Sequence, residues 1–236
     1  VCHAIACAID KATLCNTVLP GIGTPAYQFL APNMLGHDDS FGQELAYNPD
    51  KARQLLSDAG FPNGEGWPEE VYFSFGASTT FQTTFEAIQA MIKDVLNINF
   101  LLAPGDQTSA GVTLSNPPFK PLISRIMWGA DYPDPHNFMV VLYTCPPKTD
   151  EDTWKYPEIV YCDEKFDSLV WEASAEQDLE KRRQLYLQCE QELVIDNPKI
   201  IPLYYYTRYR LFKPYVKGFI LNGNGAPIIR NLSIES

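Results

Sequence analysis

Apolar residues spaced three and four positions apart predict amphipathic helices in several parts of the chain. The first predicted helix opens the sequence, and its apolar face is formed by Val1, Ala4, Ile5, Ala8 and Ile9. Further helices are predicted over residues 49–59, 81–95, 166–173 and 175–194. The inner face of the last of these is predicted to carry Leu179, Tyr186, Cys189 and Leu193.

The helix predicted over 49–59 has signals at both of its ends. Asn48 can cap the helix, Pro49 suits the first helical position, and Asp50 suits the positive end of the helix dipole. Gly60 provides the residue that commonly follows a helix, because glycine adopts the left-handed conformation without strain. The segment is therefore predicted as a helix that begins after Asn48 and ends at Gly60.

Apolar runs between the helices predict strands. One covers 71–75, and another is marked by Ile98, Phe100 and Leu102, on either side of the helix at 81–95. A strand, a helix and a strand at this spacing predict a right-handed crossover between parallel strands. Further extended segments are predicted over 123–128, 199–212 and 215–221. The pattern predicts a mixed α/β fold.

Composition and charge exclude several classes of protein. The chain has 236 residues, of which 45% are hydrophobic, so it can bury a substantial core. Its net charge of -11 argues against nucleic acid as a partner, because phosphate binding needs clustered Lys and Arg. No apolar run is long enough to predict a transmembrane segment. Because the sequence starts inside a predicted helix without Met, we expect a fragment of a longer protein.

The six cysteines form no C-x-x-C pair, which argues against zinc-ribbon and thioredoxin-like sites. Cys145 and Cys162 bracket a polar loop. A bridge between them would close a loop of roughly 15 residues and stabilise the fold by about 3 kcal/mol. Two separate buried thiols are the alternative. The other cysteines lie on apolar helical faces and are predicted as core residues: Cys2, Cys7, Cys15 and Cys189.

The sequence contains no recognisable catalytic machinery. His3, His37 and His136 are isolated, and neither a nucleophile elbow nor a phosphate-binding loop occurs. Asp131 and Asp134 are too few oxygen donors for a calcium site. We therefore predict a binding protein that is not an enzyme and has no metal or cofactor.

One segment combines a strand end with an acid and two prolines. Residues 125–138 have the sequence RIMWGADYPDPHNF, in which Asp131 follows the apolar part. Pro133 and Pro135 restrict the backbone behind it. From these residues alone two interpretations stay open, since Asp131 can cap the turn or can bind a ligand.

Five segments in order along the chain together resemble one family. They are residues 4–32, 47–64, 86–102, 128–138 and 216–235, and they include AIACAIDKATL, YNPDKARQLLSDAG, WGADYPDPHNF and VKGFILNGNGAP. They resemble the extracellular solute-binding proteins, family 5, of peptide and nickel ABC transporters. The resemblance extends over the whole chain.

The resemblance implies a fold and a division into domains. Residues 1–205 would form the second, C-terminal ligand-binding lobe, a mixed α/β lobe of a type II periplasmic-binding-protein fold. Residues 206–236 would form a tail that normally returns to complete the first lobe. The N-terminal lobe would be absent from this fragment. Without it, the tail would expose strand edges that favour association between chains.

The resemblance also implies a ligand site. In peptide-binding members, the carboxylate at the position of Asp131 pairs with the α-amino group of the peptide. Trp128 and Tyr132 would shield that pair and pack against the ligand. Arg125 either serves the carboxylate end of the ligand or forms a structural ion pair. Six residues separate Arg125 from Asp131, so in a continuous strand both would point to the same face.

The remaining expectations concern partners and location. The resemblance implies a protein that captures peptides between two closing lobes and delivers them to an ABC transporter permease. Members that bind a nickel complex, haem or oligosaccharide provide the alternative ligands. Cys145 and Cys162 lie where dipeptide-binding members carry a disulfide, which implies an extracytoplasmic location in the periplasm or at the cell surface.

Overall fold

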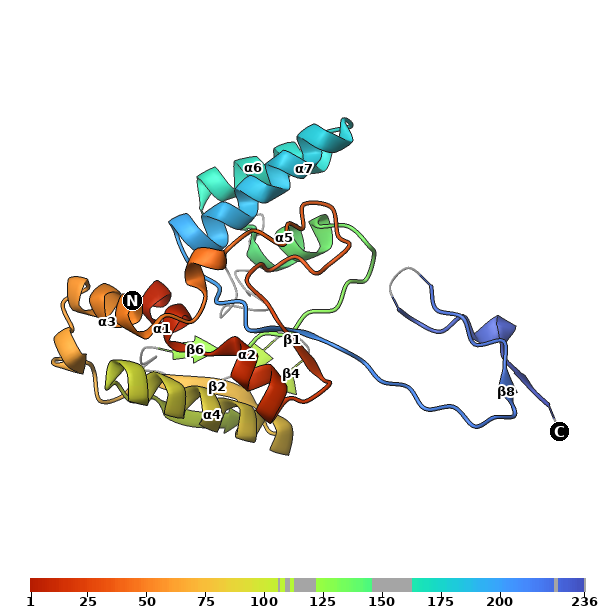
Figure 1. The fold of residues 1–236 in the computed structure, drawn as a ribbon. Coiled ribbons are helices and arrows are strands. Elements are labelled where there is room, and N and C mark those ends of the chain that lie inside the picture. The colour runs from red at the N-terminus through yellow and green to blue at the C-terminus, as the bar shows by residue number, and fades with distance from the viewer. Residues whose placement is uncertain (106, 109–110, 113–121, 146–162, 223–224, 236) are drawn as a thin grey trace, which may run out of the picture.

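A three-stranded parallel sheet with the strand order β3-β2-β6 lies beside α4 in the lower left part of the view (Figure 1). The strands are β2 (Tyr72–Gly76), β3 (Leu101–Gly105) and β6 (Leu122–Ser124). Helix α4 (Thr79–Leu96) connects β2 to β3, and these two strands are parallel, so the predicted strand-helix-strand connection between parallel strands is confirmed. The computed structural model describes residues 1–105, 107–108, 111–112, 122–145, 163–222 and 225–235.

Aromatic side chains hold α4 on the sheet. The Phe85 ring of α4 stacks on Phe75 of β2 with centroids 4.7 Å apart, and it meets Phe73 of β2 edge-on at 5.7 Å. Helix α4 begins where the Ser78 side chain accepts a hydrogen bond from the Phe81 backbone N–H. Stacked rings in a dry core add specific packing energy to the area that they bury. The sheet and α4 therefore form a firm platform for the loops that leave it.

The helix predicted at the start of the chain is interrupted. Helix α1 (Cys2–Ala8) ends at Ile9, and α2 (Lys11–Thr13) continues as a π-helical turn over Leu14–Val18. The interruption arises because the Asp10 side chain accepts from the Thr13 backbone N–H at 2.9 Å and starts a new helix. The predicted inner face is also wrong at Val1, which is exposed.

The next helix agrees closely with its sequence signals. Helix α3 (Pro49–Asp58) is capped by Asn48, whose side chain accepts from the Lys51 backbone N–H at 3.0 Å. Ala52 and Leu56 are buried on its inner face. Gly60 has a φ of 92°, the left-handed conformation that was expected after the helix.

A second layer of helices lies on the far side of the molecule from α4 (Figure 1). Helix α5 (His136–Tyr143) was not predicted, whereas α6 (Glu164–Ala175) and α7 (Leu179–Glu190) were. A π-helical turn over Gln191–Asp196 extends α7. Leu179 is 70% exposed and not on the inner face, because it is the first residue after the capping Asp178. The rest of the predicted face, Tyr186, Cys189 and Leu193, is buried.

A buried carboxylate connects this layer to the first half of the chain. Glu190 is fully buried in α7, and its two oxygens accept from the backbone N–H groups of Phe29 at 3.0 Å and Leu30 at 2.7 Å. Burial raises the pKa of Glu190 to about 7, although these two hydrogen bonds act in the opposite direction. The side chain thus holds the loop around 28–30 on the helical layer.

The strand predicted over 123–128 is shorter than expected. Strand β6 ends at Ser124, and its ladder continues by one bond, from the Arg125 backbone N–H to the Ser74 carbonyl at 2.8 Å. Residues 125–130 have no regular structure. Arg125 and Asp131 therefore do not lie in one continuous strand. The prediction that their six-residue spacing places both side chains on the same strand face was wrong.

Four cysteine thiols are free in the described part of the chain. Cys7, Cys15 and Cys189 are buried, as predicted, and Cys2 is half-buried. The disulfide predicted between Cys145 and Cys162 stays a prediction, because Cys162 lies outside the described residues.

Extended structure near the end of the chain is confined to short strands. Strand β7 (Tyr204–Tyr206) pairs antiparallel with β1 (Gly23–Pro25), and β8 (Val216–Lys217) pairs with β9 (Ser233–Ile234). The predicted runs over 199–212 and 215–221 were therefore too long. The remaining short elements are β4 (Gln107–Thr108), β5 (Gly111–Val112) and 3₁₀ turns at Gln43–Leu45, Pro62–Gly64 and Ile229–Asn231.

Beyond β7 the chain leaves the body of the molecule (Figure 1). Large apolar side chains remain exposed along this segment: Tyr206, Tyr209, Leu211, Phe212, Tyr215, Ile220, Leu221, Ile229, Leu232 and Ile234. The division into a lobe over 1–205 and a tail over 206–236 stays a prediction. None of the helices in the described part of the chain combines the length and apolar composition needed to cross a bilayer.

Candidate functional site

The candidate site lies on the loop that joins β6 to α5. This loop leaves the carboxyl end of a parallel strand, which is where open α/β sheets commonly place their ligands. It contains Arg125, Trp128, Asp131 and Tyr132, the four predicted ligand-binding residues. Trp128 and Asp131 are both hydrogen-bonded to Asn137. Arg125 lies over Phe81, and Tyr132 is hydrogen-bonded to His136.

Asp131 is exposed, and Asn137 from the first turn of α5 holds it. The Asp131 backbone N–H donates to Asn137 Oδ1 at 3.1 Å, and Asn137 Nδ2 donates to Asp131 Oδ2 at 3.3 Å. Asn137 itself is buried. The carboxylate therefore lies at the surface and is hydrogen-bonded to a buried side chain.

The carboxylate that caps the turn is Asp134. Its Oδ1 accepts from the His136 backbone N–H at 2.9 Å, at the start of α5. Both of its oxygens also accept from the Arg182 guanidinium, at 2.8 Å and 2.9 Å. Arg182 comes from α7, so this ion pair ties the site loop to the helical layer. The side chain of Asp134 thus fulfils the turn-capping role that was one of the two interpretations of Asp131.

Trp128 and Tyr132 are directed to different partners. Trp128 is half-buried against the core, and its Nε1 donates to Asn137 Oδ1 at 2.8 Å. Tyr132 is 38% exposed, and its hydroxyl is hydrogen-bonded to His136 Nδ1. One amide oxygen therefore accepts from both Trp128 and Asp131, while Tyr132 presents an aromatic surface beside them.

Arg125, for which a ligand contact or a structural ion pair was predicted, is buried. Its guanidinium lies 3.5 Å from the centroid of the Phe81 ring, and Nη2 donates to Met127 Sδ at 3.3 Å. Burial lowers the pKa of Arg125, and the nearby Tyr204 hydroxyl acts in the opposite direction. Within the described residues, Arg125 forms no ion pair with a carboxylate.

Two buried polar atoms near the sheet lack hydrogen-bond partners within the described residues. They are Nη1 of Arg125 and Oγ of Ser74. The backbones of these two residues are joined by the hydrogen bond that extends β6 along β2. A buried polar group without a partner costs about 1–3 kcal/mol, so such groups commonly mark a place where a ligand or water binds.

The sequence did not identify Asn137, Asp134 and Arg182 as parts of this site. Asn137 lies in a helix that no apolar period predicted, and Arg182 is 48 residues away from its partner. A possible signal was the Asp-Pro step at 134–135, which is a common start for a helix.

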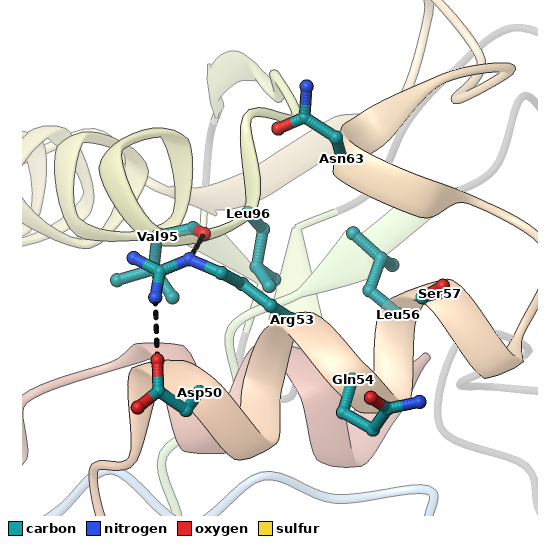
Figure 2. Close-up of a pocket in the computed structure, with 8 residues that line it drawn as sticks. All are labelled: Asp50, Arg53, Gln54, Leu56, Ser57, Asn63, Val95 and Leu96. Carbon is teal, nitrogen blue, oxygen red and sulfur yellow. Dashed lines mark hydrogen bonds and ion pairs between the residues drawn. The ribbon is translucent and has the colours of Figure 1, made fainter.

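A pocket lies elsewhere, between α3 and the end of α4, and it contains none of the predicted residues (Figure 2). Its volume is about 330 Å³. The Arg53 guanidinium in it donates to Asp50 at 3.0 Å and to the Val95 carbonyl at 3.1 Å. Leu56 and Leu96 in its floor are already buried. The Arg53 guanidinium is thus already hydrogen-bonded, and the two leucine side chains are already out of water.

Comparison with known proteins shows relatives along nearly the whole chain. A dipeptide-binding protein of Escherichia coli is 25% identical over 99% of the chain, and a dipeptide-binding protein of Bacillus subtilis is 28% identical over 92%. Heme-binding protein A of Haemophilus influenzae is 25% identical over 99%. The chain spans 42%, 39% and 41% of these relatives, respectively.

Solved structures show the same fold. A periplasmic oligopeptide-binding protein of Borrelia burgdorferi matches 98% of the chain with a TM-score of 0.72 and 21% identity. A dipeptide-binding protein of Pseudoalteromonas in complex with Met-Leu matches 99% with a TM-score of 0.72 and 20% identity. The chain covers 44% and 45% of these two proteins. The mixed α/β architecture is therefore part of a periplasmic-binding-protein fold.

The family is shown by a direct match. The model of the bacterial extracellular solute-binding proteins, family 5, matches residues 1–150, which is more than half of the chain. This is a family of solute-binding proteins and not of enzymes. The match includes α1, the parallel sheet and the loop that carries Asp131. The chain belongs to the bacterial extracellular solute-binding proteins, family 5.

Proposed function

We propose that the chain is part of an extracytoplasmic protein that captures peptides and delivers them to the permease of an ABC importer. The observation that carries the proposal is the exposed Asp131 carboxylate, which the buried Asn137 orients at the carboxyl end of the sheet. Relatives described as dipeptide- and oligopeptide-binding proteins support peptides as the ligand class.

Asp131 binds the α-amino group of the peptide in this proposal. An ammonium group that donates charge-assisted hydrogen bonds is a strong partner for a carboxylate in a closing, water-poor cleft. Because Asn137 orients the carboxylate before the ligand arrives, less ordering free energy is lost on binding. Trp128 and Tyr132 pack beside this pair and exclude water from it.

Arg125 binds the carboxylate end of the ligand, or a backbone carbonyl, in the same proposal. Nη1 of its buried guanidinium has no hydrogen-bond partner in the described residues, and neither has Oγ of Ser74. A ligand oxygen that reached this position would satisfy a donor whose burial otherwise costs stability. Phe81 beneath the guanidinium holds it in one orientation.

Two lobes are needed for capture. Residues 1–205 form the second lobe in this proposal, and residues 206–236 form a tail that pairs with the first lobe, which lies outside this chain. The exposed apolar side chains along 206–234 support a partner for the tail. The two lobes close around the ligand by a hinge motion. A Cys145–Cys162 disulfide fits the extracytoplasmic location.

A non-peptide ligand is the second candidate. The haem-binding relative is as similar to the chain as the dipeptide-binding protein of Escherichia coli, at 25% identity for each. Haem and nickel complexes have no ammonium group, so they would leave Asp131 to find a different cationic or hydrogen-donating partner. Because Asp131 is an exposed carboxylate at the carboxyl end of the sheet, we favour a peptide, which carries an ammonium group, over these ligands.

Calorimetry on the two-lobed protein tests the proposal. Short peptides with a free amino group are compared with their N-acetylated forms, in the wild type and in Asp131→Asn. We expect acetylation and the substitution each to weaken binding by about tenfold or more, which corresponds to about 1.4 kcal/mol. Asp50→Asn, which changes an exposed carboxylate on α3, is the matched control and leaves affinity unchanged. Equal affinity for free and acetylated peptides would overturn the proposal.

A further inference from the structure

The buried Asn137 side chain is hydrogen-bonded to three groups of the site loop, which belong to the two residues Trp128 and Asp131. Its Oδ1 accepts from Trp128 Nε1 at 2.8 Å and from the Asp131 backbone N–H at 3.1 Å, and its Nδ2 donates to the Asp131 carboxylate at 3.3 Å. The side chain is 1% exposed, so water does not replace these bonds easily. We infer that Asn137 is the positioning residue that fixes Trp128 and Asp131 for the ligand.

The chemistry of the carboxamide suits this task. The carbonyl oxygen of Asn has two lone pairs and can accept from two donors, while its amide group donates to an acid. An Asp at the same position would lose the donor that faces Asp131, and a Ser or Ala is too short to reach. Asn137 is therefore the residue that can serve all three partners at this distance.

The support of Asn137 is rigid because helix α5 begins there. The Asn137 backbone N–H donates to the Asp134 carbonyl at 3.0 Å, and the following residues, Phe138 and Met139, are buried in the core. Asp134 is fixed in turn by the bidentate ion pair with Arg182. Sites held by a packed helix vary less in geometry than sites held by loop residues alone.

This inference deepens the proposed function and rests on it for its consequence. Asn137 does not contact the ligand and acts through Asp131 and Trp128. A carboxylate that is already oriented loses less freedom when an ammonium group binds. Removing Asn137 should therefore reduce the preference for a free amino group over an acetylated one, and not merely reduce stability.

The first test needs no ligand. In the ¹⁵N-labelled chain, hydrogen exchange is measured at the Trp128 indole N–H, assigned with Trp128→Phe, and at the Asp131 amide. Asn137→Ala should accelerate exchange at both positions by about tenfold or more, because each N–H loses its acceptor. Unchanged exchange at both positions overturns the inference, whatever ligand the protein binds.

Gln28→Ala is the matched control. Gln28 is also a buried carboxamide, 2% exposed, whose Nε2 donates to the Gly36 carbonyl and whose Oε1 accepts from the Asp38 backbone N–H, both at 2.8 Å. The substitution removes comparable hydrogen bonds away from the site loop. We expect it to leave exchange at Trp128 and Asp131 unchanged. Equal acceleration in both variants would show general loosening and would also overturn the inference.

The second test uses the two-lobed protein and alanine di- and tripeptides, free and N-acetylated. Asn137→Ala should lower the ratio of free to acetylated affinity by about fivefold, the value of one hydrogen bond. Gln28→Ala should leave the ratio unchanged. An unchanged ratio in Asn137→Ala, with wild-type binding intact, overturns the positioning role but not the proposed function. If the wild type binds none of these peptides, the proposed function fails and the exchange result alone decides the role of Asn137.

Discussion

Glu190 is a carboxyl group whose buried surroundings favour its protonated form. It is fully buried, and its two hydrogen bonds come from neutral backbone groups of Phe29 and Leu30. Neutral donors compensate only part of the cost of taking a carboxylate out of water. The nearby Tyr143, Cys189 and Tyr205 add no positive charge, and burial raises the pKa of Glu190 from its usual 4.5 to about 7.

The first prediction concerns this group. The folded state holds the Glu190 proton more tightly than the unfolded state does, so its contribution is fully present below pH 4.5. It is lost as the pH rises from 4.5 to about 7. This loss is on the order of 3 kcal/mol. Glu190→Gln cannot titrate, so its free energy of unfolding should decline less between pH 5 and 7, as measured by urea denaturation. The same slope in both proteins would contradict the prediction.

At the scale of single residues, the sequence pointed to Asp131 as the proposed ligand residue but not to the residues that support it. Asp131 could be proposed because a family motif surrounds it. Asn137 could not, because a buried amide within an apolar helical turn has no sequence signal before its partners are known. Arg125 was proposed as a residue of the site, but its burial over Phe81 could not be predicted, because it depends on β6 ending at Ser124. Where a short strand ends is decided by tertiary pairing and not by local preference.

Ion pairs that connect helices and loops in this structure differ in how much they stabilise it. Arg182 makes a bidentate pair with Asp134, and their side chains are 17% and 29% exposed. Its neighbour Arg183 makes a similar pair with Glu180 within α7, but the Glu180 side chain is 68% exposed. Exposed pairs along a helix contribute little, whereas a partly buried bidentate pair contributes more.

The second prediction uses these two arginines as a matched pair. Arg182→Lys keeps the charge but loses the planar fork and the Nε donor to the Ala173 carbonyl, so it should destabilise the chain by about 2 kcal/mol. Arg183→Lys should change the free energy of unfolding by about 0.5 kcal/mol or less. Thermal and urea denaturation of both variants measure the difference. Equal losses of unfolding free energy would mean that the Arg182–Asp134 pair stabilises the chain no more than the exposed Arg183–Glu180 pair does.

The third prediction concerns two glycines with left-handed backbones after α3. Gly60 has a φ of 92° and open space where a Cβ would stand, whereas Gly64 has a φ of 79° and a Cβ there would lie 2.4 Å from the Asn97 carbonyl oxygen. Gly60→Ala should cost about 1 kcal/mol from backbone strain alone. Gly64→Ala should cost about 2 kcal/mol more, because backbone must move. Denaturation of the two variants compares them, and an equal cost would argue against the close approach.

Among the elements, those with strong local periodicity could be predicted. The crossover through α4 and the cap of α3 at Asn48 follow from apolar spacing and capping chemistry. The interruption at Asp10 was missed because an apolar face continues across it, although the Asp10 side chain starts a new helix. Helix α5 was missed because its composition is apolar nearly all round, which gives a short segment no helical period.

At the scale of the whole molecule, the segment after β7, which is the proposed tail, leaves many apolar side chains exposed. Hydrogen bonds within this segment include those from Arg210 to the Gly225 carbonyl and from the Glu235 backbone N–H to the Tyr215 carbonyl. The Tyr209 hydroxyl donates to the Gly21 carbonyl and connects the start of the segment to the first part of the chain. Large exposed apolar groups on a segment with short open strands favour pairing with another surface.

The last prediction tests what the tail does in this chain. Leu211, Ile229 and Ile234 are 100%, 74% and 79% exposed, so replacing all three with Ser removes apolar surface without opening the core. We expect sedimentation velocity to show self-association of the unmodified chain that rises with concentration, and less association in the triple variant and in a chain ending at residue 210. The midpoint of thermal unfolding at low concentration should stay within about 2 °C, since exposed side chains contribute little to stability. Association that persists unchanged without residues 211–236 would mean that the self-association surface lies within residues 1–210. A large fall in the unfolding midpoint would instead mean that the tail packs on the lobe in solution, which would contradict its proposed role as a segment that pairs with another lobe.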